Sequence, residues 1–538
     1  MHLRPSSLKK PTKNFGIKIA TPKQKNQNIM TVIGELIKKA IDVTGFISGN
    51  PDPVKSQKEV LLSLLEKAKD TAFGKKFGFR EILDSENPIS KFQQAVPIHD
   101  YDKMNNDWWH YLLEGHQNVT WPGGQNYFAL SSGTTSNSKH IPVTDDMLDA
   151  IRKSGITQIL GLKNFDLPGD FFEKQTLMLG SCTDLIQKDD HEEGEISGIS
   201  ASNIPAWFKG YYKPGEEIAG IKDWDEKLKR IVEEAPKWDI GSLSGIPSWI
   251  QMMLKAIIDH HQLKNIHDIW PNLQVYTSGG VAFEPYRSSF EKLLAHPIIY
   301  IDTYLASEGY MATQLRPDTS SMALNINNGI FFEFVPFEEH YLDENGAVKQ
   351  DAKVLPFADT QENTDYVLLI STVSGAWRYM IGDTVMITDK EKAEIKITGR
   401  TKHYLNVVGS QLAVHQMNTA LEQLGKDYKI AIKEFVVAAI HKNEEYIHKW
   451  FLGIEGNTTS ISCGDVANSL DDLLKTNNKN YAVARSKALK GVEVEILPVE
   501  KLYQWNEEKK NLGGQAKIPR VMKEEDFLEL DAFLKAKA

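Results

Sequence analysis

The sequence predicts an α/β fold in which a large N-terminal domain is followed by a smaller α+β domain. Three observations carry this prediction. A chain of 538 residues is too long for one hydrophobic core, so two or more domains are expected. Amphipathic helices alternate with short apolar strands, which is the pattern of helices layered on parallel sheets. After about residue 400 the pattern changes, which indicates a separate small domain.

Helices and strands of the large domain follow from the spacing of apolar residues. Spacing of three to four residues predicts helices over residues 32–41 and 60–72. Thr144 is expected to cap a helix that begins near Asp145. Short apolar runs predict buried strands at residues 273–276, 298–301 and 330–335. Four closely spaced strands between residues 366 and 398 are expected to form an antiparallel, barrel-like part that closes the domain.

The C-terminal part alternates helices with longer apolar strands. Helices are predicted at residues 414–424 and 470–474, and strands at 435–440, 450–454 and 492–497. His441 and His448 flank an expected hairpin between the first two of these strands and are expected at the surface. These elements indicate a domain of the α+β class. We therefore expect three regions, which are an extension over residues 1–29, a large domain over 30–399 and a small mobile domain over 400–538.

The first 29 residues differ in charge from the rest of the chain. They contain seven Lys and Arg and no Asp or Glu, whereas the whole chain has a net charge of −10. The segment lacks the apolar core of a signal peptide. Two interpretations are favoured, which are a disordered extension and a gene start placed too early, with Met30 as the true initiator. A transit peptide is a third, which the prolines and the lack of a clear amphipathic stripe disfavour. The acidic remainder argues against a nucleic-acid partner.

Apolar runs and cysteines indicate in which cellular compartment the protein is expected. The sequence has no run of 18 apolar residues, so no membrane span is predicted. Its two cysteines, Cys182 and Cys463, are far apart and predict neither a disulfide framework nor a zinc site. A cytoplasmic location is expected, because the cytoplasm keeps thiols reduced. The oligomeric state cannot be predicted from these features.

A loop rich in small hydroxyl residues is the first candidate site. Residues 131–139 read SSGTTSNSK and follow an apolar strand end at 127–130. Backbone N–H groups and short hydroxyls of such a loop approach phosphate oxygens closely, and Lys139 adds a positive charge. The loop is not a Walker A motif, because G-x-x-x-x-G-K-[ST] is absent. The alternative is an ordinary polar surface loop.

Four further motifs follow this loop in chain order. They are YLASEG at 304–309, YMIGDTV at 379–385, GRTK at 399–402 and GGQAK at 513–517. In this order the motifs resemble the adenylate-forming enzymes, the superfamily of firefly luciferase. Within it the chain most closely resembles the Gretchen Hagen family, the auxin-responsive acyl-acid amido synthetases. The resemblance implies a large adenylate-forming domain, a smaller C-terminal domain, and ATP and Mg²⁺ as cofactors.

The resemblance also implies a role for each motif. Glu308, expected at a strand end beside Ser307, is the candidate Mg²⁺ ligand, and Asp383, expected in a tight Gly-Asp turn, is the candidate acceptor for the ribose hydroxyls. Arg400 is expected to contact ribose or phosphate. Lys517 would act as a catalytic cation that swings into the adenylation site. The remaining nucleotide contacts are expected from Ser131, Ser132, Thr134, Thr135, Lys139, Gly279, Gly280 and Tyr304, the last by stacking on the base.

The predicted reaction activates a small carboxylic acid with ATP and then passes the acyl group to an amine, expected to be an amino acid. The amide-forming step comes from the resemblance alone. Two alternatives stay open. An acyl-CoA ligase shares the first half-reaction. A catalytically inactive nucleotide-binding protein is the other, since the phosphate loop is shorter than the family's.

Overall fold

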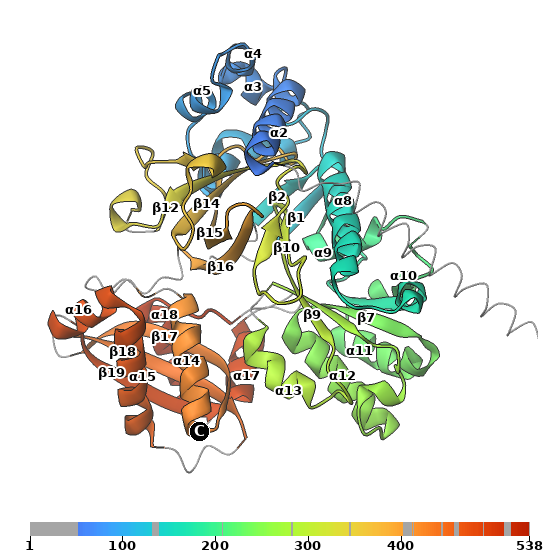
Figure 1. Ribbon diagram of the computed structural model, residues 1–538, viewed down its shortest axis with the longest axis vertical. Helices are drawn as coiled ribbons and strands as arrows, with labels where there is room; N and C mark the ends of the chain where they lie inside the picture. Colours follow the sequence, from blue (N-terminus) through green and yellow to red (C-terminus); the bar gives the residue numbers. More distant parts are fainter. Residues whose placement is uncertain are drawn as a thin grey trace, which may run out of the picture.

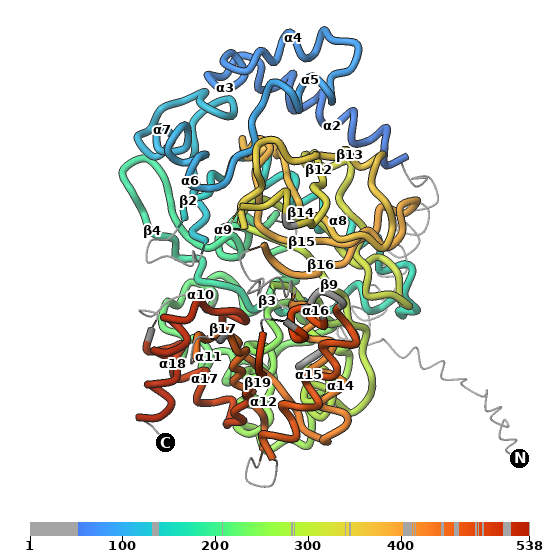
Figure 2. Tube along the Cα trace, turned by 90° about the vertical axis from the view of Figure 1, so that its left-hand side faces the viewer, coloured from blue at the N-terminus to red at the C-terminus, as the bar shows by residue number. Residues whose placement is uncertain are grey.

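The structure is a computed structural model, and Figures 1 and 2 show its arrangement from two sides. It describes residues 52–131, 139–206, 208–280, 283–343, 346–401, 412, 414–442, 445–456, 462–487, 489–509 and 518–536. The basic segment 1–29 and the helix expected at 32–41 lie outside the described residues.

One twelve-stranded sheet forms the centre of the large domain. Its order is β13-β12-β14-β15-β16-β11-β10-β9-β8-β7-β3-β6. The parallel half contains β3 (Gln175–Leu179), β6 (Tyr212–Lys213), β7 (Ile240–Gly245), β8 (Val275–Gly279) and β9 (Ile299–Ala306). The antiparallel half contains β10 (Gly309–Thr313), β11 (Met322–Leu324), β12 (Ile330–Pro336), β13 (Leu355–Pro356), β14 (Asp365–Thr372), β15 (Tyr379–Asp389) and β16 (Glu394–Arg400).

The antiparallel strands expected between residues 366 and 398 are present, but their place in the fold differs from the expectation. They belong to the same sheet as the parallel strands, joined through the β9–β10 hairpin, and the order of that sheet is open at both ends. The hairpin reverses the chain at Ser307 and Glu308. It therefore lies where the parallel half of the sheet meets the antiparallel half.

Helices cover the parallel half, as an α/β layering requires. The three longest are α11 (Trp224–Glu234), α12 (Pro247–His261) and α13 (Glu284–Glu291), which pack with strands β7 and β8 around a buried apolar cluster (Figure 1). Leu243, Ile250 and Tyr276 are fully buried in that cluster. Burial of such side chains stabilises the layer by roughly 1.5–3 kcal/mol each.

A second sheet of four strands carries the candidate phosphate loop. Its order is β2-β1-β5-β4, with bounds Lys139–Val143, Tyr127–Ser131, Glu192–Gly194 and Ile186–Gln187. Strands β1 and β2 form an antiparallel hairpin in which Ser131 pairs with Lys139. Helix α8 (Asp145–Gly161) follows directly, and Thr144 caps it by accepting a 3.0 Å hydrogen bond from the N–H of Met147, as predicted.

Eight further helices belong to the described part of the large domain. They are α2 (Pro53–Ala68), α3 (Ala72–Lys76), α4 (Phe79–Leu83), α5 (Pro88–Ala95), α6 (Tyr101–Met104), α7 (His110–Leu113), α9 (Ile196–Ser202) and α10 (Glu216–Ala219). The first four lie at the blue end of Figure 1, over strands β12 and β14. The helix expected at 60–72 corresponds to α2, which begins at Pro53 because Asp52 caps it with its carboxylate.

The small domain is a three-stranded sheet between two layers of helices. Its strands are β17 (Ala431–Lys442), β18 (Glu445–Glu455) and β19 (Leu489–Pro498), in the order β17-β18-β19. Its helices are α14 (Val414–Tyr428), α15 (Cys463–Asn477), α16 (Lys479–Lys487), α17 (Val499–Lys509) and α18 (Glu524–Ala536). Alternate residues of β17 enter the two apolar clusters, Val437 on one face and Val436 on the other. This alternation follows from the two-residue period of a strand.

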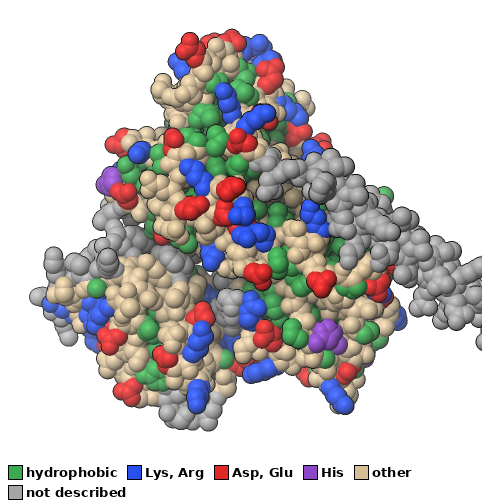
Figure 3. Space-filling model, viewed as in Figure 1, with side chains coloured by type: hydrophobic (Ala, Val, Ile, Leu, Met, Phe, Trp, Pro, Cys, Tyr) green, Lys and Arg blue, Asp and Glu red, His purple; other side chains and the backbone are tan. Residues whose placement is uncertain are grey.

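The surface and the helices bear on two further expectations. Acidic and basic side chains are interspersed on the face in Figure 3, which shows no continuous basic area. Within the part of the chain that the structure describes, no helix has both the length and the apolar composition needed to cross a bilayer.

Candidate functional site

The site is built around the turn between β9 and β10, which carries Ser307 and Glu308. Gly309 follows with φ +154°, and a Cβ there would approach Ile330 at 3.1 Å. The Glu308 side chain is only 7% exposed. In α/β sheets, ligands bind in the crevice beyond the carboxyl ends of the parallel strands, where this turn lies. Burial of a charged group costs free energy. A carboxylate that is buried at such a place is therefore a candidate functional group.

Asp383 lies on β15, across from Arg400 on β16. Its Oδ2 accepts a 2.5 Å hydrogen bond from the Tyr304 hydroxyl, and its Oδ1 lies 2.7 Å from Nε of Arg400. The sequence predicted a tight turn here, and that prediction is wrong, because Asp383 lies inside a strand. The preceding Gly382 has φ +87°, and its carbonyl accepts a 2.8 Å hydrogen bond from the N–H of Thr401. The glycine therefore distorts the strand beside Asp383 without ending it.

Glu308 and Asp383 are electrostatically coupled. Burial and the Asp383 carboxylate raise the pKa of Glu308, and Arg400 and Lys139 lower it. Burial is the larger effect of the two that raise it. Two inward-facing carboxylates that repel each other form an environment that a cation would stabilise. This is the donor set expected for a divalent ion bound to a nucleotide.

A magnesium ion here would depend on few protein ligands. The described residues contain no group of three or more His, Cys, Asp or Glu arranged to hold a metal ion. Mg²⁺ in nucleotide sites is commonly held by one or two carboxylates together with phosphate oxygens and water. The arrangement of Glu308 therefore fits an ion that arrives with a nucleotide.

Tyr304 supports Asp383 in this structure. Its side chain is 5% exposed and belongs to the main core cluster of the large domain. Burial and Asp383 raise its pKa well above the usual value, so the hydroxyl keeps its proton and donates it in the hydrogen bond. The structure places this ring beneath Asp383, whereas the sequence predicted that it stacks on a base.

Ser131 and Lys139 frame the candidate phosphate loop as the last and first residues of β1 and β2. Ser132, Thr134 and Thr135 lie outside the described residues. The Lys139 Nζ lies 5.0 Å from the ring of Tyr101. Because the ammonium of Lys139 also lowers the pKa of Glu308, the C-terminal end of the loop lies within electrostatic reach of Glu308.

Gly279 is the last residue of β8, and Gly280 follows it. A Cβ on Gly279 would lie 2.9 Å from Oγ1 of Thr303 on β9, and Gly280 has φ +83°. Both conditions exclude larger residues, the first by contact and the second by backbone conformation. The exposed backbone at this strand end is available to a ligand in the same crevice.

Lys517 lies outside the described residues, so its predicted role stays a prediction. The chain is described again from Ile518, and Arg520 pairs with β17 of the small domain through its carbonyl. The boundary predicted at residues 399 and 400 falls at the end of β16, just before the undescribed residues 402–411.

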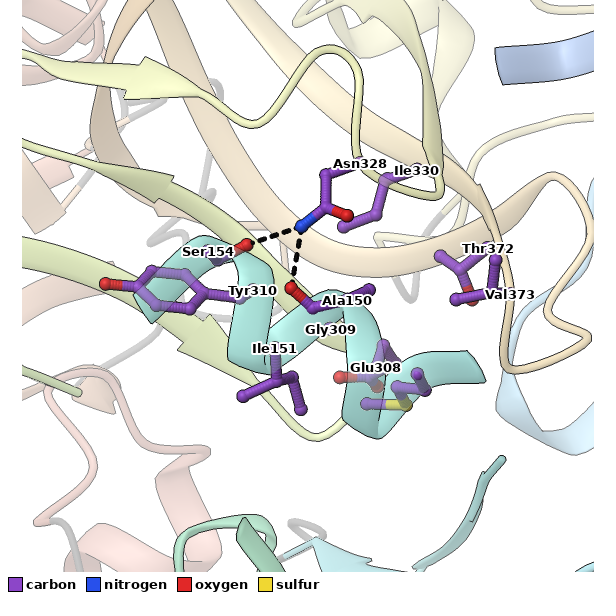
Figure 4. A pocket seen from close by; sticks show the side chains of 11 residues that line it. Ala150, Ile151, Ser154, Glu308, Gly309, Tyr310, Asn328, Ile330, Thr372 and Val373 are labelled. Atoms are coloured by element: carbon purple, nitrogen blue, oxygen red, sulfur yellow. Dashed lines mark hydrogen bonds between the residues drawn. The ribbon is translucent and has the colours of Figure 1, made fainter. Parts of the chain in front are cut away.

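A cavity behind Glu308 is too small for a substrate. It lies between α8, β10 and β12, and Figure 4 shows Asn328 bonded to the Ala150 carbonyl and the Ser154 hydroxyl on its wall. Its volume of about 10 Å³ is about the space that one water molecule needs. The packing of α8 therefore leaves no substrate-sized space between this helix and Glu308 in this cavity.

Two tyrosines of the site had no role in the sequence prediction. Tyr379 is buried, and burial and the Glu308 carboxylate raise its pKa well above normal. The Tyr101 hydroxyl accepts a 3.0 Å hydrogen bond from the N–H of His140, next to Lys139. The sequence contained a signal that Tyr379 lies near Asp383, because the two are four residues apart. Residues separated by an even number of positions in a strand lie on the same face of the sheet. Tyr101 gave no such signal.

Comparison with known proteins places this geometry in context. Indole-3-acetic acid-amido synthetase GH3.8 of Oryza sativa subsp. indica is 24% identical over 284 residues, which cover 49% of this chain and 46% of the relative. The corresponding synthetase GH3.2 of Arabidopsis thaliana is 26% identical over 172 residues, 30% of each chain. The chain thus spans about half the length of the first of these curated relatives.

Solved structures share the fold over a longer range. AtGH3.15 acyl acid amido synthetase in complex with 2,4-DB superposes with a TM-score of 0.72 at 16% identity, over 92% of this chain and 96% of that chain. A 2-hydroxyisobutyryl-CoA ligase in the postadenylation state with 2-HIB-AMP gives a TM-score of 0.54 at 11% identity, over 90% and 92%. The two-domain α/β architecture is therefore that of adenylate-forming enzymes.

Family models settle the relationship. The GH3 family N-terminal domain matches residues 50–230, the GH3 family central domain matches 323–400, and the GH3 family C-terminal domain matches 412–526. These three models follow one another in order and together cover more than half of the chain. The chain belongs to the GH3 (Gretchen Hagen) family, as the order of its motifs predicted.

Proposed function

We propose that this protein is an acyl-acid amido synthetase that uses ATP and Mg²⁺. In the first half-reaction a carboxylate oxygen attacks the α-phosphorus of ATP, the bond to the β-phosphate breaks, and pyrophosphate leaves. In the second, the amine of an amino acid attacks the carbonyl carbon of the acyl-adenylate. AMP leaves, the amine loses a proton, and an amide forms.

The observation that carries the proposal is the electrostatic coupling of the buried carboxylate of Glu308, beyond the carboxyl ends of the parallel strands, to the half-buried carboxylate of Asp383. Asp383 is held on both oxygens by Tyr304 and Arg400. Each carboxylate oxygen has two lone pairs, so Asp383 can still accept ribose hydroxyls. Phosphoryl and adenylyl transfer depend mainly on positioning and on neutralising charge, and these fixed groups supply both.

The proposed role of each site residue follows from its charge. Glu308 would hold Mg²⁺, which neutralises phosphate charge when it is bound. Lys139 and the loop that it closes are suited to the phosphates, and Arg400 adds a cation beside the ribose acceptor. Lys517 is proposed to enter from the small domain for the first half-reaction and to leave for the second. The backbone at Gly279 and Gly280 is proposed to lie against the adenine.

An amino acid is the proposed acceptor because the curated relatives are named amido synthetases. Coenzyme A is the competing acceptor, since a CoA ligase shares the fold. The two acceptors need different binding sites. Coenzyme A carries phosphates, which require a cationic binding site that an amino acid does not need. The proposed compartment is the cytoplasm, since both cysteines, Cys182 and Cys463, are free.

The experiment is acid-dependent exchange of labelled pyrophosphate into ATP. A panel of indole, aryl and short aliphatic acids is offered with ATP and Mg²⁺. Exchange with at least one acid supports adenylation. Tight ATP binding with no exchange from any acid would favour an inactive nucleotide-binding protein.

A further inference from the structure

The two domains meet at a buried polar contact that the proposed chemistry does not use. Tyr286 of α13 is 4% exposed, and its hydroxyl donates a hydrogen bond to Glu434 of β17, which is 6% exposed. The second oxygen of Glu434 pairs with the guanidinium of Arg520. We call Tyr286, Glu434 and Arg520 the docking contact. Figure 1 shows α13 facing the small domain at this place.

A β-bulge directs two consecutive residues of β17 toward α13. The pairing of β17 with β18 shifts register between Ile432 and Glu434. Neighbouring residues of a regular strand point to opposite faces, and a bulge relaxes that rule. Lys433, next to Glu434, therefore also reaches α13, where its Nζ donates a 2.7 Å hydrogen bond to Oγ of Ser289. The bulge thus allows two neighbouring residues of β17 to contact α13.

When the two domains separate, the docking contact leaves none of its charged groups without an oppositely charged partner. Glu434 and Arg520 both belong to the small domain, so their ion pair would move with it. Within the docking contact, the large-domain group that loses its partner on separation is the Tyr286 hydroxyl, which is neutral because burial and Glu434 raise its pKa well above normal. Beside it, Lys433 would lose Ser289 but keep Glu455 of its own domain 3.6 Å away, and the Lys255–Glu455 ion pair between the domains is already exposed to solvent. An exposed neutral hydroxyl is readily hydrated, whereas an unpaired buried charge is strongly destabilising. The contact therefore suits an interface that forms and separates.

The docking contact lies close in sequence to both halves of the proposed active site. Helix α13 begins four residues after Gly280, which ends the turn of β8. Arg520 follows Lys517 by three residues. Fixing Arg520 against α13 therefore limits where the small domain can place residues just before it.

We propose that Tyr286, Glu434 and Arg520 are positioning residues that hold the small domain in the orientation for acyl-adenylate formation. This inference rests on the proposed function and adds to it the contact that selects one half-reaction. Weakening the contact should shift the small domain toward other orientations. Adenylate formation would slow, and consumption of an adenylate supplied ready-made would not.

The test uses Tyr286→Phe, which removes one hydroxyl and keeps the ring. The chain has one free cysteine in each domain, Cys182 and Cys463, so spin labels on these two report the distance between the domains in the full chain. Without substrates, the variant should show a broader distance distribution than the wild type. With substrates, pyrophosphate exchange should fall by about tenfold, the scale expected for losing a hydrogen bond to a charged group. Aminolysis of a pre-made acyl-adenylate should change less than twofold.

The matched control is Tyr111→Phe, because Tyr111 lies on α7 and is 42% exposed. It should leave the distance distribution and both half-reactions unchanged. An unchanged distance distribution in a folded Tyr286→Phe variant overturns the docking contact. Equal slowing of both half-reactions overturns its selectivity. If the wild type exchanges no pyrophosphate with any acid, the proposed function fails, and the distance measurement still decides whether the contact holds the domains.

Discussion

The Tyr304 hydroxyl donates a 2.5 Å hydrogen bond to Oδ2 of Asp383, and this bond joins the strand that leads into Glu308 to the strand that carries Asp383. Tyr304 therefore holds Asp383 directly, and it lies on the strand that ends at the turn carrying Glu308. Arg400 holds the other oxygen of Asp383 at 2.7 Å. A carboxylate fixed on both sides presents its remaining lone pairs in one direction, which is the preorganisation that ligand binding favours.

Asp383→Asn should weaken ATP binding by about 1.5–3 kcal/mol, the range for hydrogen bonds to a charged group. Tyr304→Phe should weaken it by about 1 kcal/mol, because it removes the support and keeps the acceptor. Titration calorimetry with a non-hydrolysable ATP analogue measures both. Asp389→Asn, on the same strand and away from Tyr304, is the control. Unchanged affinity in a folded Asp383→Asn variant would rule out the ribose role.

Glu308→Gln should reduce acyl-adenylate formation by about 10²-fold or more, the scale of losing a main electrostatic contact in the transition state. The substitution keeps the shape of the side chain and removes its charge. Pyrophosphate exchange over a range of Mg²⁺ concentrations measures the effect. Glu86→Ala, an exposed residue of the large domain, is the control and should behave as wild type. Near-normal exchange at ordinary Mg²⁺ in the Gln variant would remove Glu308 from the metal site.

The same substitution should stabilise the fold at neutral pH, by about 1–4 kcal/mol, the range for replacing buried ionic groups. Burial and Asp383 raise the pKa of Glu308, so the folded protein holds its proton more tightly than the unfolded chain does. The stability due to this group is then present below the ordinary pKa of 4.5 and is lost as pH rises through the raised value. Thermal unfolding should show the advantage of Glu308→Gln at pH 7 and its decline on acidification. A Gln variant that is less stable at pH 7 would contradict this prediction.

Lys517→Ala should slow acyl-adenylate formation by about 10²-fold and spare the consumption of a pre-made adenylate. The reason is that a mobile cation helps only while charge develops on the phosphate and the attacking carboxylate. Separate assays of the two half-reactions give the result, and Lys523→Ala, which lies six residues further along, serves as the control. Equal damage to both half-reactions would argue against a lysine that enters and leaves.

His448→Leu should stabilise the small domain by about 1–3 kcal/mol, the cost of leaving a buried polar group unsatisfied. His448 is fully buried on β18, and neither ring nitrogen has a hydrogen-bond partner among the described residues. Burial lowers its pKa to about 3, so wild-type stability should fall as pH drops from about 6.5 toward 3, and the Leu variant should lose this dependence. Thermal unfolding against pH measures both effects. The exposed His441, as His441→Leu, is the control, and equal behaviour of the two variants would contradict the account.

The sequence predicted the family because it depends on local motifs, and it predicted the positions of some residues of the candidate site in the fold. Glu308 was expected at a strand end, and it lies in a turn between two strands. Thr144 was expected to cap a helix, and its hydroxyl does so. Both predictions rest on residues within a few positions of one another, where propensity and spacing are informative.

The failures come from contacts between distant segments. The prediction that His448 lies on the surface is wrong, because β18 is the central strand of its sheet and helices cover both faces. The hydrogen bond from Tyr304 to Asp383, 79 residues away, gave no signal in the sequence, and the stacking of this ring on a base stays a prediction. Asp383 was expected in a turn because a Gly-Asp pair favours one, and pairing with β16 keeps it in a strand. Tertiary pairing overrides local preference at each of these positions.

The most direct test of the account is product analysis with the purified full chain. ATP, Mg²⁺ and an acid that supports pyrophosphate exchange are supplied, and the twenty amino acids and coenzyme A are offered separately. Mass spectrometry should find an amide of the acid with at least one amino acid, together with AMP, and Glu308→Gln should abolish both. Efficient thioester formation with coenzyme A and no amide from any amino acid would contradict the account.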